Sequence, residues 1–166
     1  MAAWLKNLFG AKPASAASPA APDPARASTD WLARGNEQVA QGHWAEAANC
    51  YRRACEVDPE SASAAVNLGY ALLESGRADE AEQALQLARR LRPDNADALF
   101  MLGRIAYAKG DPDAAVQHLQ TVIRLQPSLP FPYALLGRAH AKAGREADAA
   151  AAIEQGLALH PHDAEL

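Results

Sequence analysis

The sequence predicts an all-α solenoid of four helix-turn-helix units, each 34 residues long. Four columns of equivalent residues keep this interval through four copies without an insertion: Gly35, Gly69, Gly103 and Gly137; Gly42, Gly76, Gly110 and Gly144; Ala47, Ala81, Ala115 and Ala149; Pro59, Pro93, Pro127 and Pro161. A constant interval of this length indicates a repeat architecture in which each unit is one supersecondary motif. Much of the 49% hydrophobic share is alanine, and runs of β-branched residues are nearly absent, which favours helices over strands.

Each unit is expected to hold two helices. In the second unit, the first helix runs over residues 62–75 and ends at Gly76, because glycine adopts the left-handed C-terminal conformation at little cost. The second helix carries apolar residues at helical spacing on one face, namely Ala81, Leu85, Ala88 and Leu91. Pro93 closes the unit, since proline cannot continue a helix. In the third unit, Asp111 followed by Pro112 predicts the start of the second helix.

The repeat also sets the predicted boundaries. The chain divides into a short amphipathic segment at residues 1–12, a Pro/Ala-rich linker at 13–27, four units at 28–61, 62–95, 96–129 and 130–163, and a tail at 164–166. The small residues Gly69 and Ala81 are expected to let the two helices of one unit touch closely. A large side chain in these columns would push the helices apart.

This pattern resembles the tetratricopeptide repeat (TPR) family over about four fifths of the chain. The first unit supplies the family positions as Trp31, Gly35, Ala47, Tyr51, Ala54 and Pro59, and the third unit as Leu99, Leu102, Gly103, Ala115, Leu119, Val122 and Pro127. The resemblance implies a right-handed α-solenoid. Arg34 and Gln38 replace the usual leucine and tyrosine of the first helix, as expected where the outermost unit faces water.

We expect no comparable polar surface at the C-terminal end of the repeats. TPR arrays commonly finish with an extra solvating helix, but only residues 164–166 follow the last unit here, and Gly156 stands where alanine is usual. We therefore expect an exposed apolar edge. Fraying, burial by self-association and burial by a partner are the alternative fates of this edge.

By resemblance to TPR proteins, the first helices line a concave groove that binds extended peptides or helices. The candidate partner-binding residues are Asn36, Asn67, Tyr70, Phe100, Arg104, Tyr107, Phe131, Arg138 and Lys142. Other expected lining residues include Leu32, Val39, Val66, Leu73 and Met101. Aromatic rings supply contact area and arginine binds carboxylates in bidentate fashion, so the hypothesis is a protein or peptide ligand with apolar anchors and an acidic group. Alternatively, these residues partly fill the inter-repeat core and the arginines are solvated.

Two TPR subclasses can be tested on the sequence. Chaperone-binding TPR domains hold a carboxylate with two asparagines, which Asn36 and Asn67 match, and with several basic residues. The basic positions are instead occupied by Leu32, Asp97 and Met101. Because Asp97 would repel a carboxylate, the co-chaperone role is not expected. The asparagine ladder of glycosyltransferase relatives is also missing, since that column reads Ala33, Asn67, Met101 and Leu135.

The amino-terminal segment breaks the repeat pattern. Its large apolar residues fall on one face of a short expected helix: Trp4, Leu5, Leu8 and Phe9. One hypothesis is that this segment contacts a membrane peripherally or is a docking motif tethered by the linker. The other is that it is disordered and either packs against the repeats or makes no contact. No apolar run is long enough for a transmembrane helix or a secretory signal, so a cytoplasmic location is expected, including the inner membrane surface.

The sequence contains few residue patterns typical of an active site. The glycines follow the repeat rather than a nucleotide-binding loop, and Cys50 has no assignable base, so no enzyme, cofactor or metal site is expected. A net charge of −4 argues against general nucleic-acid binding. The sequence thus predicts a non-catalytic protein–protein interaction adaptor or assembly factor. The alternatives are a self-assembling scaffold that forms a homo-oligomer through the C-terminal unit, and a regulatory module of a separate glycosyl- or methyltransferase.

Overall fold

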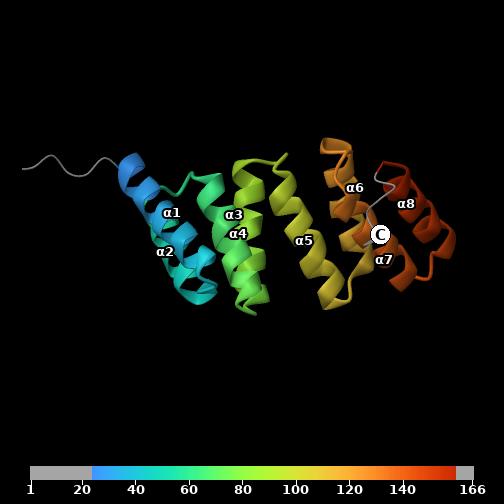
Figure 1. Ribbon diagram of the computed structural model, residues 1–166, viewed down its shortest axis with the longest axis horizontal. Coiled ribbons are helices and arrows are strands. Elements are labelled where there is room, and N and C mark those ends of the chain that lie inside the picture. The colour runs from blue at the N-terminus through green and yellow to red at the C-terminus, as the bar shows by residue number, and fades with distance from the viewer. Residues whose placement is uncertain (1–23, 160–166) are drawn as a thin grey trace, which may run out of the picture.

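The computed structural model describes residues 24–159 as a single row of helices (Figure 1). In order these are α1 (Pro24–Ala40), α2 (Trp44–Val57), α3 (Ala62–Glu74), α4 (Ala78–Leu91), α5 (Ala96–Lys109), α6 (Pro112–Leu125), α7 (Pro130–Lys142) and α8 (Glu146–Leu159). The described part of the chain contains no strand. The prediction of an all-α helical solenoid is confirmed. The predicted segment 1–12 and the tail 164–166 lie outside the described residues.

The turn inside each unit depends on a glycine with a left-handed backbone. Gly42, Gly76, Gly110 and Gly144 have φ values of 75°, 81°, 84° and 74°. Residues with a Cβ rarely adopt this conformation, so the helix ends where the glycine stands. At the end of α5, for example, the backbone N–H of Gly110 donates to the carbonyls of Ala106 and Tyr107.

Side-chain caps begin several of the helices. The Asn95 side chain accepts a hydrogen bond of 2.9 Å from the backbone N–H of Ala98 at the start of α5. Asp111 accepts one of the same length from Ala114 at the start of α6, where Pro112 occupies the first turn. Each cap satisfies an N–H group that has no partner within its helix. The predicted role of the Asp111-Pro112 pair is confirmed.

The two helices of each unit meet at the other glycine column. A Cβ atom added to Gly103 of α5 would lie 3.1 Å from Cγ of Leu119 in α6, and Leu119 is fully buried. An added Cβ at Gly69 would lie 2.5 Å from Cγ of Leu85. The helices therefore pack against each other at these positions with no room for a large side chain.

The units stack so that the first helices come closest together. Besides packing within and between successive units, α3 contacts α5 and α5 contacts α7. Within residues 24–159, no pair of second helices makes a comparable contact. The side formed by α1, α3, α5 and α7 is therefore the concave side of the array.

The two ends of the array differ in polarity. On α1, Arg34 and Glu37 are exposed, whereas the equivalent residues of α3, Leu68 and Ala71, belong to the apolar core. At the other end Leu157 of α8 is 39% exposed, although its equivalent Ile123 in α6 packs into a cluster with α7. The N-terminal unit thus exposes charged groups at these positions, and the C-terminal unit exposes Leu157.

Charged side chains bridge the junction between the second and third units. Nζ of Lys109 in α5 donates hydrogen bonds of 2.6 Å to both Asp79 and Glu82 of α4. The hydrogen bond from Lys109 holds the pKa of Asp79 below its usual range, and its two acceptors raise the pKa of Lys109. At the next junction the residue equivalent to Glu82 is Val116, which is buried in an apolar cluster.

Replacing Gly103 with leucine is expected to lower the free energy of unfolding by at least about 1–3 kcal/mol, because the new side chain overlaps Leu119. Urea denaturation measures the change. The matched control is Ala108→Leu on the exposed face of the same helix, which is expected to stay within about 0.5 kcal/mol of wild type. Equal stability of the two variants would contradict the close approach at the glycine column.

The Lys109 contact predicts a pH dependence of stability. Because the folded state lowers the pKa of Asp79, the stabilisation is present above about pH 4 and is lost as the pH falls through the lowered value. The variant Lys109→Met should therefore lose less stability than wild type between about pH 6 and about pH 3. Thermal melts across this range test the difference, and Arg90→Met, which removes an exposed cation of α4, should retain the wild-type slope.

Candidate functional site

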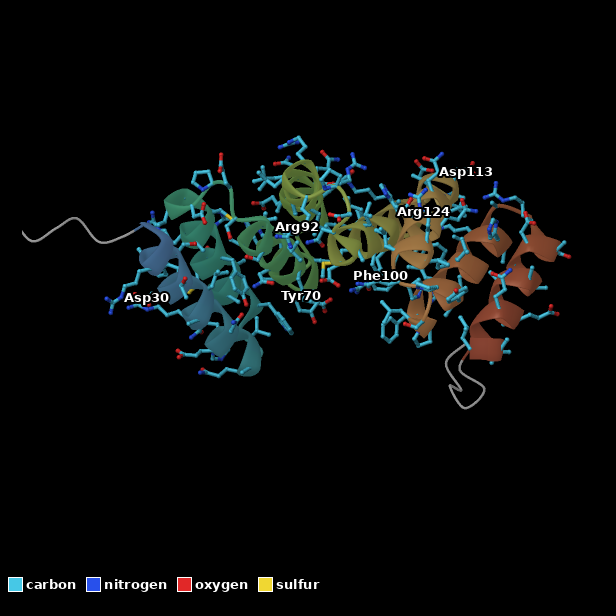
Figure 2. All side chains as sticks on the ribbon, turned by 90° about the horizontal axis from the view of Figure 1, so that it is seen from above. Asp30, Tyr70, Arg92, Phe100, Asp113 and Arg124 are labelled. Atoms are coloured by element: carbon cyan, nitrogen blue, oxygen red, sulfur yellow. The ribbon has the colours of Figure 1, made fainter. Side chains whose placement is uncertain are left out.

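The candidate groove residues come from equivalent positions of α1, α3, α5 and α7. Because the units repeat one geometry, residues 34 apart lie on corresponding faces of neighbouring first helices. One such column reads Asn36, Tyr70, Arg104 and Arg138. Figure 2 shows the labelled Tyr70 and Phe100 on one side of the array, and Asp113 of α6 on the opposite side. The candidate site is thus a stripe along the concave side whose chemistry changes from unit to unit.

The N-terminal half of the stripe is uncharged. The Tyr70 ring meets Trp44 of α2 edge to face, with ring centroids 5.4 Å apart and planes at 83°. Oδ1 of Asn36 accepts a hydrogen bond of 2.7 Å from the hydroxyl of Tyr51, whose pKa is raised by burial and secondarily by Cys50. Asn67 is half-buried. Asn36 therefore uses its acceptor inside the fold and keeps its amide N–H groups for other contacts.

The middle of the stripe holds a cross-unit ion pair. The Arg104 guanidinium of α5 lies 3.3 Å from a carboxylate oxygen of Glu74 in α3, and both side chains are partly exposed. An exposed pair of this kind contributes little to stability. It does hold the Arg104 side chain at the groove surface.

The C-terminal half of the stripe gathers two further cations around one aromatic ring. The Arg138 guanidinium lies 5.3 Å from the centroid of the Tyr107 ring, and Nζ of Lys142 lies 4.6 Å from it. Lys142 also donates a hydrogen bond of 2.9 Å to the Tyr107 carbonyl. Within residues 24–159, neither Arg138 nor Lys142 forms an ion pair. Both positive charges are exposed and available to an anionic group.

Two phenylalanines form an apolar patch at the N-terminal ends of α5 and α7. The rings of Phe100 and Phe131 have centroids 6.2 Å apart and planes inclined at 56°. Phe131 is 57% exposed, whereas Phe100 is half-buried against the core. We call this pair the Phe100–Phe131 patch.

Some of the expected lining belongs to the core instead. Val66, expected on the groove surface, is only 8% exposed and lies inside the main apolar cluster. The residues that pack partly against that cluster are Leu32, Val39, Leu73 and Met101. The prediction that Val66 lies on the groove surface is wrong, because the helices around it approach closely enough to bury its side chain.

Sequence reasoning missed two residues of the groove. Trp44, which contacts Tyr70, follows the turn of the first unit at a position where the other units have Ala78, Pro112 and Glu146. Glu74, which pairs with Arg104, lies at the position equivalent to Lys142 two units later. Two signals in the sequence could have identified them. Trp44 is a large aromatic residue in a column of smaller or polar residues, and Glu74 and Arg104 carry opposite charges on neighbouring first helices.

The described residues form no cluster suited to metal binding. Residues 24–159 contain no group of three or more His, Cys, Asp and Glu side chains placed to hold a metal ion. His160, His162 and Asp163, which are close in sequence, lie outside that range. In the same part of the chain, no helix combines the length and the apolarity needed to span a membrane.

The groove cations are expected to contribute little to folding. Arg138→Ala and Lys142→Ala should each lower the free energy of unfolding by less than about 1 kcal/mol, because exposed cation–π contacts are weak. Leu119→Ala, which empties a fully buried site, should cost about 2–5 kcal/mol. Urea denaturation compares the three variants. Losses as large as that of Leu119→Ala would make the cations structural.

Comparison with known proteins agrees with this geometry. Tetratricopeptide repeat family models match residues 32–96, 85–130 and 130–155. No curated protein matches the chain by sequence. The crystal structure of MamA protein is 25% identical with a TM-score of 0.76, covering 83% of this chain and 75% of that chain.

Two further solved structures share the fold at lower identity. YrrB, described as a TPR protein with an unusual peptide-binding site, is 20% identical with a TM-score of 0.76, covering 85% of this chain and 73% of that chain. The first TPR of Spaghetti (RPAP3), bound to the HSP90 peptide SRMEEVD, is 21% identical with a TM-score of 0.70, covering 72% and 94%. This fold is typical of non-catalytic protein–protein interaction modules. The chain therefore belongs to the tetratricopeptide repeat family.

Proposed function

We propose that the protein is a non-catalytic adaptor or assembly factor that binds a peptide segment of a partner protein in its concave groove. The peptide carries an apolar anchor and at least one acidic group. The apolar anchor contacts the Phe100–Phe131 patch, and the acidic group binds the cations beside Tyr107.

The observation that carries the proposal is the exposed cation cluster on the concave side. Arg138 and Lys142 converge on the ring of Tyr107, and no described carboxylate neutralises them. Arg104 occupies the position equivalent to Arg138 in the preceding unit. Glu74 balances the charge of Arg104 only in part, because both groups remain in contact with solvent. A carboxylate entering this region gains two charge-assisted contacts without displacing an existing ion pair.

Apolar surface beside the cations supports the same ligand. Phe131 is 57% exposed and lies in the first turn of α7, the helix that also carries Arg138 and Lys142. Large aromatic side chains next to arginine are typical of the residues that dominate protein–protein binding energy. Two solved proteins of this fold are described as peptide-binding or peptide-bound, and one of those peptides, SRMEEVD, combines acidic and apolar residues.

A second candidate function is self-assembly through α8. Leu157 and Leu159 are 39% and 48% exposed on α8, whose other exposed residues are four alanines and four polar or charged residues. An apolar helix face of this kind favours association with another surface. Contact with a membrane through residues 1–12, and a cytoplasmic location, stay predictions from the sequence.

Selection of random peptides displayed on phage tests the groove directly. Enriched peptides are expected to combine an aromatic or aliphatic residue with Asp or Glu. The variant Arg138→Glu/Lys142→Glu should bind a selected peptide at least about tenfold more weakly than wild type, because both charges then repel its carboxylate. Isothermal titration measures the affinities.

The matched control reverses two exposed arginines on the second helices, Arg90→Glu/Arg124→Glu. This variant has the same net charge as the groove variant, so long-range electrostatics are equal in the two. It should bind the peptide as wild type does. Equal weakening in both variants, or no weakening in either, would overturn the groove assignment.

A further inference from the structure

The most exposed large apolar side chain among the described residues lies on the concave side. Phe131 is 57% exposed, whereas the other exposed large hydrophobics, all leucines on second helices, are between 37% and 48% exposed. Its ring lies beside that of Phe100, so the exposed surface is a pair of aromatics and not a single side chain. Adjacent exposed aromatics mark a docking surface.

We propose that the Phe100–Phe131 patch is the docking site for residues 4–9 of the same chain, Trp-Leu-Lys-Asn-Leu-Phe. This segment lies outside the described residues. Its four large apolar residues occur as two pairs with a spacing of four: Trp4 with Leu8, and Leu5 with Phe9. The inference goes beyond the proposed function, because the occupant is the chain itself and no outside ligand is needed.

The linker is long enough for this contact. Residues 10–23 separate Phe9 from the start of α1, and a Pro-rich stretch of this length extends over about 43 Å at about 3.1 Å per residue. From α1 the path to the patch crosses the packed neighbours α2, α3, α5 and α7. With about 8–10 Å for each step between packed helices, α7 lies at most about 40 Å away.

The start of α1 also lies on the same edge of the array as the starts of α5 and α7. All first helices run in the same direction, because every unit repeats one helix-turn-helix. Pro24 at the start of α1 and the patch at the starts of α5 and α7 therefore lie along one edge of the array. Figure 1 shows the first turns of α1 and α5 at its upper edge. The segment does not have to cross the array to reach the patch.

Charge around the patch fits this segment. Asp97 lies one helical turn before Phe100 and Asp94 just precedes α5; both are exposed and neither forms an ion pair within residues 24–159. Lys6 lies inside the proposed segment and Lys12 follows it. Arg104, one helical turn after Phe100, is already paired with Glu74. The basic segment therefore meets acidic groups at the edge of the patch.

Photo-crosslinking in the full chain tests the contact without any ligand. The variant Phe131→p-benzoylphenylalanine keeps an aromatic group in the patch. After irradiation in dilute solution and digestion, mass spectrometry should find crosslinks from position 131 to residues 1–12 of the same molecule. Adding the changes Trp4→Ser, Leu5→Ser, Leu8→Ser and Phe9→Ser should lower their yield at least about tenfold, because the apolar contact is lost.

The matched control places the same photo-reactive group at Leu125, an exposed leucine at the end of the second helix α6. It should give no crosslink to residues 1–12. Mixing the chain with an isotope-labelled copy separates crosslinks within a molecule from those between two molecules. The proposal is overturned if position 131 never reaches residues 1–12, reaches them only in a second copy, or reaches them no more often than position 125. Because no peptide is added, these outcomes do not depend on the proposed peptide binding.

Discussion

The close approach of the two helices in each unit is the constraint on which the array depends. A glycine of the first helix lies directly against a large side chain of the second, as Gly69 lies against Leu85 and Gly103 against Leu119. This contact fixes the distance and angle inside the unit, and the left-handed glycine that follows the first helix fixes the turn. Because every unit repeats both features, the units stack with one geometry and the first helices gather on one side.

The same regularity frees the groove residues to vary. A column such as Asn36, Tyr70, Arg104 and Arg138 has no packing role in common, so its chemistry can change without changing the fold. In this chain the change is directional. The N-terminal half is uncharged and its Asn36 bonds to Tyr51, whereas the C-terminal half carries cations around Tyr107 next to exposed Phe131. In the proposed function, position along the groove therefore decides which part of a ligand binds where.

The repeat explains how much could be predicted from sequence. Gly110 and Pro112 act on their own backbone, so each predicted a helix boundary that the structure confirms: the end of α5 and the start of α6. Contacts between units were harder to predict, because they depend on how far neighbouring helices are shifted relative to one another. The burial of Val66, the Trp44–Tyr70 contact and the Lys109 hydrogen bonds all arise there. The start of α1 at Pro24, before the unit boundary predicted at residue 28, reflects a local preference, since proline suits a first helical turn.

The most direct test of the central claim, a concave groove with a cationic C-terminal half, is an amide NMR titration of the full chain with a selected acidic peptide. The account predicts shift changes concentrated on α5 and α7, strongest near Arg104, Tyr107 and Arg138, with α4 and α6 little affected. Changes concentrated on the second helices, or on the outward face of α8, would contradict it and would place binding on another surface of the array.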